Sequence, residues 1–85
     1  MATETKGANV KALVIEALAN AHFRLKFEKE AIPEGYSIPE TEDGLVTIGY
    51  LAGKMRMNRI RVLVGGTVEV LLDQYGGKPR ITRRL

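Results

Sequence analysis

The sequence predicts an all-β fold in which short strands close into a small barrel, accompanied by one short helix. Apolar and polar residues alternate over several short segments, and glycine pairs separate these segments. The chain has only 85 residues and no cysteine, so neither a disulfide nor a thiolate metal site can support its modest core. Closing a sheet into a barrel suits such a chain because closure removes exposed strand edges.

The first part of the chain contains one ambiguous segment and one clear strand. Residues 1–8 are polar, and we expect them to be loose. Residues 10–21 place apolar side chains at a helical spacing, yet three β-branched residues among them favour a strand, so the pattern leaves both open. Phe23, Leu25 and Phe27 alternate with charged residues, which predicts a half-buried strand.

The middle of the chain predicts a loop, a strand and a helix in that order. Residues 28–44 contain two prolines, two glycines and six acidic residues against one lysine, which is typical of a long loop. Residues 45–51 have strand character. Residues 52–59 are rich in helix formers and contain no proline, which favours one or two helical turns.

Glycine pairs at 65–66 and 76–77 predict the turns that border the last two strands, residues 67–72 and 80–85. Four clear strands, a further segment that could be the first strand, and a helix between the third and fourth strands follow the order of an OB-fold. We expect one such domain over residues 1–85.

Charge is divided unevenly along the chain. Residues 1–50 carry five basic and eight acidic side chains, whereas residues 51–85 carry eight basic and two acidic ones. Four cations and one amide lie between Lys54 and Arg61, and phosphate groups would screen their mutual repulsion. A solvated helix face with Met55 packed inward is the plainer interpretation, and both can hold together.

Residues 47–63, TIGYLAGKMRMNRIRVL, resemble the signature stretch of bacterial translation initiation factor one. The shared pattern is Gly-Lys-Met-Arg followed by Asn and Ile-Arg, and the resemblance extends over about residues 10–30 and 44–85. It implies a five-stranded S1-like OB-fold barrel, with residues 10–21 as a strand and a short helix between strands three and four.

The resemblance also implies a function and its partners. Such a factor binds the small ribosomal subunit at the aminoacyl-tRNA site, against ribosomal RNA of the decoding centre. There it supports start-site and initiator tRNA selection together with the other two initiation factors. On this basis we expect a cytoplasmic monomer that binds RNA and catalyses no reaction.

Positions that match the family's basic segment, together with basic strand positions, form the predicted RNA-binding site. Its residues are Arg24, Tyr50, Lys54, Arg56, Asn58, Arg59, Arg61, Arg80, Arg83 and Arg84. Three of them depart from the family pattern, because Tyr50 replaces a usual histidine, Arg59 a usual tyrosine and Arg83 a common aromatic residue. Tyr50 can stack on a base or serve as a core aromatic beside Ile48.

The acidic loop at residues 31–43 is a further departure, because the family has only a tight turn between its second and third strands. Phosphates would repel its charge, so we expect it to point away from the RNA. It could contact a protein partner, hold other elements in place, or be a tolerated insertion.

Catalytic, metal and cofactor sites are not expected. His22 is the only histidine and Ser37 the only serine, and neither has partners at a suitable spacing. The longest apolar run, residues 12–15, is too short to span a membrane. The alternatives to an initiation factor are a free OB-fold protein that binds single-stranded RNA, an RNA chaperone, or a protein-interaction module that uses the acidic loop.

Overall fold

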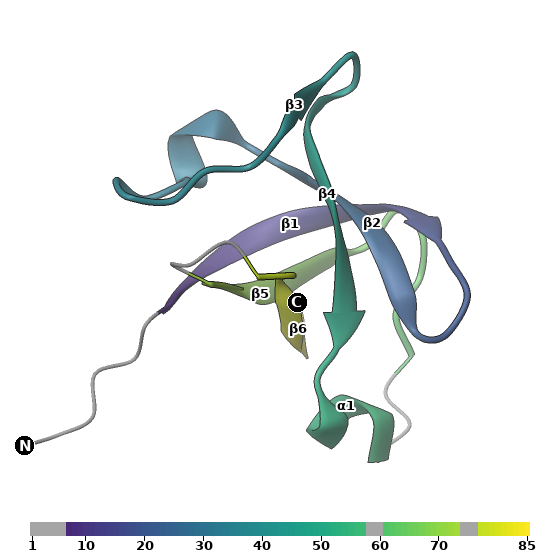
Figure 1. The fold of residues 1–85 in the computed structure, drawn as a ribbon. Coiled ribbons are helices and arrows are strands. Elements are labelled where there is room, and N and C mark those ends of the chain that lie inside the picture. Colours follow the sequence, from purple (N-terminus) through teal and green to yellow (C-terminus); the bar gives the residue numbers. More distant parts are fainter. Residues whose placement is uncertain (1–6, 58–60, 74–76) are drawn as a thin grey trace, which may run out of the picture.

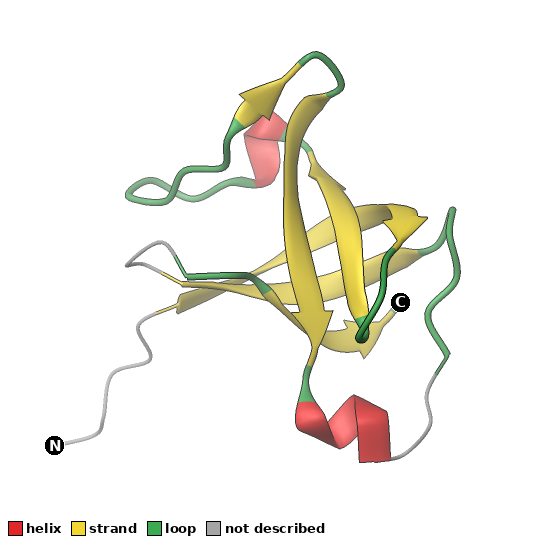
Figure 2. Ribbon diagram, turned by 45° about the vertical axis from the view of Figure 1, so that its right-hand side comes forward, coloured by secondary structure: helices red, strands yellow, loops and turns green. Residues whose placement is uncertain are grey.

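The computed structural model describes residues 7–57, 61–73 and 77–85. The barrel strands are β1 (Gly7–Ala17), β2 (His22–Phe27), β4 (Gly44–Leu51), β5 (Thr67–Asp73) and β6 (Arg80–Arg84). The other elements are the 3-10 helix η1 (Lys29–Ala31), the two-residue strand β3 (Glu40–Thr41) and helix α1 (Gly53–Met57). Five strand pairings close the sheet into a barrel, and all of them are antiparallel except the pairing of β4 with β6. The strand order is β2-β1-β5-β6-β4-β3, and pairing of β2 with β4 completes the closure (Figure 1, Figure 2).

Strand β1 occupies the segment that the residue pattern left open between helix and strand. Val10, Ala12 and Val14 are buried, and Lys11 and Leu13 between them are exposed. This alternation of buried and exposed positions is that of a strand with one face on the core. The strand that the family resemblance implied for residues 10–21 is therefore confirmed as far as Ala17.

The length of β1 follows from its two neighbours. Its first part pairs with β5 from Gly7 to Leu13, and its second part pairs with β2 from Leu13 to Ala17. A register shift after Val14 marks a β-bulge, which bends the strand from one neighbour toward the other. Because the pairing begins at Gly7, the last two residues of the expected loose segment 1–8 belong to the sheet.

The core lies inside the barrel, and all five barrel strands contribute buried residues to it. β4 supplies the buried Val46 and the half-buried Leu45 and Leu51. The other buried strand members of the core are Val10, Ala12, Val14, Phe23, Leu25, Phe27, Val68, Val70, Leu72 and Ile81. Met55 of α1 joins them with only 1% of its surface exposed and closes one end of the barrel.

The predicted loop at residues 28–44 contains η1 and β3, and its apolar residues contact the core. Ile32, Tyr36 and Ile38 are half-buried and pack against the core cluster. Figure 1 shows this segment at one end of β4 and α1 at the other. The loop therefore covers the barrel end that the helix does not cover.

Gly49 marks a place where the backbones of β4 and β6 approach closely. A Cβ atom at this position would lie 2.6 Å from Cδ1 of Leu25 and 2.9 Å from the carbonyl oxygen of Pro79. That same oxygen accepts a hydrogen bond from the backbone N–H of Tyr50, at 3.1 Å. The missing side chain thus lets β4 pair with the start of β6.

We expect Gly49→Ala to lower the free energy of unfolding by about 1 to 3 kcal/mol, because overpacking must shift Leu25 and the Pro79 backbone. Chemical denaturation followed by circular dichroism measures this loss. Gly53→Ala is the matched control, since a Cβ there meets nothing within 4 Å. It should change stability by no more than about 1 kcal/mol, in the stabilising direction. Equal effects of the two substitutions would contradict the close approach.

Candidate nucleic-acid interface

Helix α1 presents cations on both sides of one buried anchor. The carbonyl oxygen of Ala52 accepts hydrogen bonds from the backbone N–H groups of Met55 and Arg56, at 3.0 and 3.2 Å, which starts the helix. Met55 points into the core, while Lys54 and Arg56 on either side of it are exposed. Both interpretations of this run therefore hold together, with the methionine packed inward and the cations in solvent.

Backbone and side-chain hydrogen bonds join the segments around α1 to β6. The backbone N–H of Ala52 donates to the carbonyl oxygen of Ile81, at 2.9 Å. Farther along, Nη1 of Arg84 donates to the carbonyl oxygen of Arg61, at 3.2 Å. Arg61 and Arg84 are both exposed, so these bonds bring their charges to the same end of the barrel as the helix cations.

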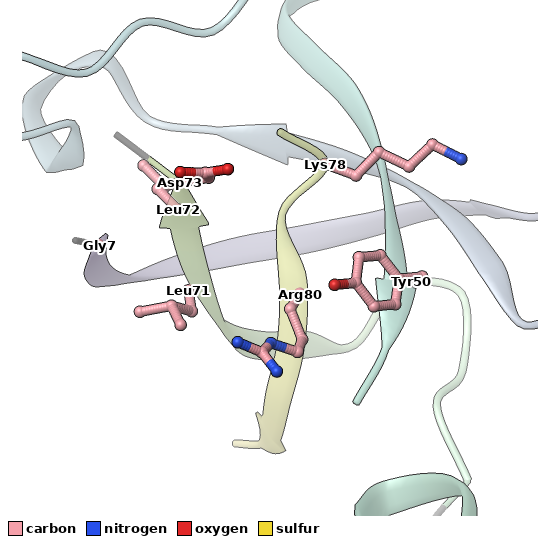
Figure 3. Close-up of a pocket in the computed structure, with 7 residues that line it drawn as sticks. All are labelled: Gly7, Tyr50, Leu71, Leu72, Asp73, Lys78 and Arg80. Atoms are coloured by element: carbon pink, nitrogen blue, oxygen red, sulfur yellow. The ribbon is translucent and has the colours of Figure 1, made fainter. Parts of the chain in front are cut away.

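Tyr50 and Arg80 lie side by side on neighbouring strands, because parallel pairing of β4 and β6 aligns them in register. Both line a hollow of about 320 Å³, which Figure 3 shows together with Lys78, Asp73 and residues of β5. Tyr50 is half-buried and does not belong to the core cluster of the described residues. Of the two roles predicted for it, the structure therefore favours the outward-facing aromatic.

His22 and Lys78 extend this row, although the sequence prediction included neither in the site. His22 is the register partner of Tyr50, and their ring centroids lie 6.3 Å apart. Nζ of Lys78 lies 3.2 Å from Nε2 of His22. Lys78 is part of the stretch Gly77–Ile81 that carried the family resemblance, whereas only strand register could have placed His22 beside Tyr50.

Two of the predicted cations face carboxylates. Nε of Arg24 lies 2.8 Å from Oε1 of Glu16, and Nε of Arg83 lies 3.5 Å from Oε1 of Glu69. Both pairs are open to solvent, so water weakens each attraction. The carboxylates nevertheless reduce the positive potential at Arg24 and Arg83 relative to the helix cations.

The predicted site therefore divides into three parts. Lys54, Arg56, Arg61 and Arg84 gather around α1, Tyr50 and Arg80 line the hollow, and Arg24 and Arg83 form ion pairs. Within residues 7–57, 61–73 and 77–85, no carboxylate lies within ion-pair distance of the cations in the first two parts. The predicted ligands Asn58 and Arg59 lie outside the described residues.

No group of three or more His, Asp or Glu side chains in the described part of the chain could hold a metal ion. No helix among those residues is long and apolar enough to cross a membrane.

Comparison with known proteins decides the family. Over 82 residues the chain is 38% identical to "Translation initiation factor IF-1, chloroplastic" of Tetradesmus obliquus, a match that covers 95% of this chain and 67% of that protein. Over 76 residues it is 34% identical to the protein of the same name from Oryza sativa subsp. indica, covering 88% of this chain and 58% of that protein. The chain belongs to the IF-1 family of translation initiation factors.

A solved structure from this family has the same fold. The solution structure of translation initiation factor one from the wolbachia endosymbiont strain TRS of Brugia malayi matches with a TM-score of 0.65 and 28% sequence identity. The match covers 94% of this chain and 79% of that one. No protein-family model matches the chain. The OB-fold prediction and the resemblance found at residues 47–63 are therefore confirmed, and with them the assignment to translation initiation.

The hydrogen bonds of His22 predict the tautomer of its neutral ring in this IF-1 chain. The carbonyl oxygen of Asn20 lies 2.8 Å from Nδ1 and can only accept, so Nδ1 carries the proton. The ammonium group of Lys78 can only donate, so Nε2 is the acceptor. Long-range ¹H–¹⁵N spectra of the neutral ring should show the Nδ1–H form. Lys78→Met should reduce that preference, and an Nε2–H ring in the unsubstituted chain would refute the arrangement.

Proposed function

We propose that this IF-1 chain binds the small ribosomal subunit at the aminoacyl-tRNA site, against RNA of the decoding centre, and catalyses no reaction there. It supports start-site and initiator tRNA selection together with the other two initiation factors. The observation that supports this most directly is α1, where the buried Met55 holds Lys54 and Arg56 outward without a carboxylate partner among the described residues. Such cations fit phosphate oxygens.

The proposed mechanism is occupancy of a site. The chain fills the space that a tRNA would take and holds the surrounding RNA in one arrangement. Its affinity arises from cations that displace counterions from phosphates. Tyr50 beside Arg80 adds an aromatic surface on which a base can stack. A monomer acting in the cytoplasm is part of the same proposal, although the two relatives compared above are named as chloroplast proteins.

A free RNA-binding OB-fold protein or RNA chaperone is less well supported. Such proteins present several aromatic side chains as stacking platforms. Here Phe23 and Phe27 are buried in the core, and Tyr36 packs against the end of the barrel. Among the described aromatic residues, Tyr50 alone lines the basic hollow, which suits one specific contact better than a platform.

Arg56→Ala combined with Arg61→Ala should weaken binding to purified small ribosomal subunits by roughly ten- to a hundred-fold, because two charge-assisted phosphate contacts are lost. Co-sedimentation of the labelled chain with small subunits measures this, and large subunits test selectivity. Lys11→Ala with Lys29→Ala removes the same charge from exposed positions away from α1 and should leave affinity within about two-fold. Equal losses in both double variants would remove the site assignment.

The salt dependence of binding should report the same contacts. On a plot of log affinity against log salt concentration, the slope should become shallower by about 0.7 to 0.9 for each phosphate contact removed. Arg56→Ala and Lys54→Ala should each show this change. Arg24→Ala should show a smaller one, because Glu16 already faces that guanidinium. A slope that is unchanged in the helix variants would show that α1 does not contact phosphates.

A further inference from the structure

A groove of about 620 Å³ lies between the segment 28–40 and the ends of β2 and β4, at the barrel end far from α1. Its lining includes the apolar or aromatic residues Phe27, Ile32, Tyr36, Ile38 and Leu45 beside charged ones. Of these five, only Phe27 is fully buried, and the others keep part of their surface in solvent. The groove therefore offers apolar surface that folding of the described residues leaves incompletely covered.

An open strand edge runs beside this groove. β3 is the last strand of the sheet order, and among the described strands it pairs only with β4. The hydrogen bonding to β4 begins one residue before β3, since the carbonyl oxygen of Pro39 accepts from the N–H of Val46 at 3.1 Å. An edge of this kind can accept a further strand from another chain, with side chains entering the adjacent groove.

The charge around the groove selects the occupant. Glu28, Glu30 and Glu40 line it together with Lys26 and Lys29. Outside the lining, three more exposed acids of the connection between β2 and β4, Glu34, Glu42 and Asp43, give the surroundings a clear negative excess. This excess repels nucleic acid and attracts a cationic protein segment.

We propose that this groove binds an extended protein segment rich in lysine or arginine, which adds beside β3 and places one apolar side chain against the apolar part of the lining. The segment belongs to a protein partner and not to RNA. The site is separate from the basic end of the barrel, so the chain can hold RNA with α1 and a basic protein with the opposite end. Peptide binding to the isolated chain does not depend on the proposed ribosomal function.

The test uses the full ¹⁵N-labelled chain and a short synthetic peptide in which lysine alternates with threonine around one central leucine. We expect saturable amide shifts in β3, in residues 28–39 and at the start of β4. Replacing the central leucine by serine should weaken binding, and replacing the lysines by glutamate should abolish it. Short oligouridine should instead shift residues of α1 and β6.

Matched charge variants separate the groove from general attraction. Glu30→Lys with Glu40→Lys changes two lining residues, and Glu34→Lys with Glu42→Lys makes the same charge change outside the lining. The first pair should weaken the peptide about ten-fold, and the second by only about two- to three-fold, because its charges act on the peptide through solvent and not within the groove. Amide spectra report whether each variant is folded.

Four results would overturn the proposal. They are equal weakening by both variant pairs, no peptide-induced shifts, oligouridine shifts at the groove, and concentration-dependent shifts there without peptide. The last result would identify a second copy of the chain as the occupant.

Discussion

Closure of the barrel depends on β4, because this strand pairs with three others. It runs antiparallel to β2 from Leu45 to Tyr50, parallel to β6 at Tyr50 and Leu51, and antiparallel to β3 at its start. The parallel contact is short and requires close approach at Gly49. Without this parallel contact, β6 would pair with β5 alone. The row of side chains from His22 through Tyr50 to Arg80 would then not form.

The same strand separates the two ends of the molecule. α1 follows its last residue after one intervening position, and β3 pairs with its first two residues. Each end is closed by apolar side chains from outside the barrel, Met55 at one and Ile32, Tyr36 and Ile38 at the other. In both cases packing inward leaves charged neighbours exposed, so the covering of the core and the placement of charge have one cause.

Much of the fold could be predicted from the sequence, because β2 and β5 alternate regularly and glycine pairs precede β5 and β6. Residues 10–21 could not be assigned from their pattern, since the bulge after Val14 breaks the alternation there. The basic run at α1 was visible because its residues are adjacent in the sequence. The hollow and the ion pairs were not visible. Tyr50 and Arg80 of the hollow meet only through strand register, and Arg24 and Glu16 are eight residues apart. The groove beside β3 likewise depends on how a loop folds, which no periodicity specifies.

The opposite charges at the two barrel ends have a kinetic consequence. Cations around α1 and carboxylates around β3 make the molecule an electric dipole directed along β4. In the field of a large polyanion, such a dipole turns while it diffuses and arrives with its positive end foremost. Under the proposed function, a larger fraction of encounters then begins with the α1 end facing the RNA.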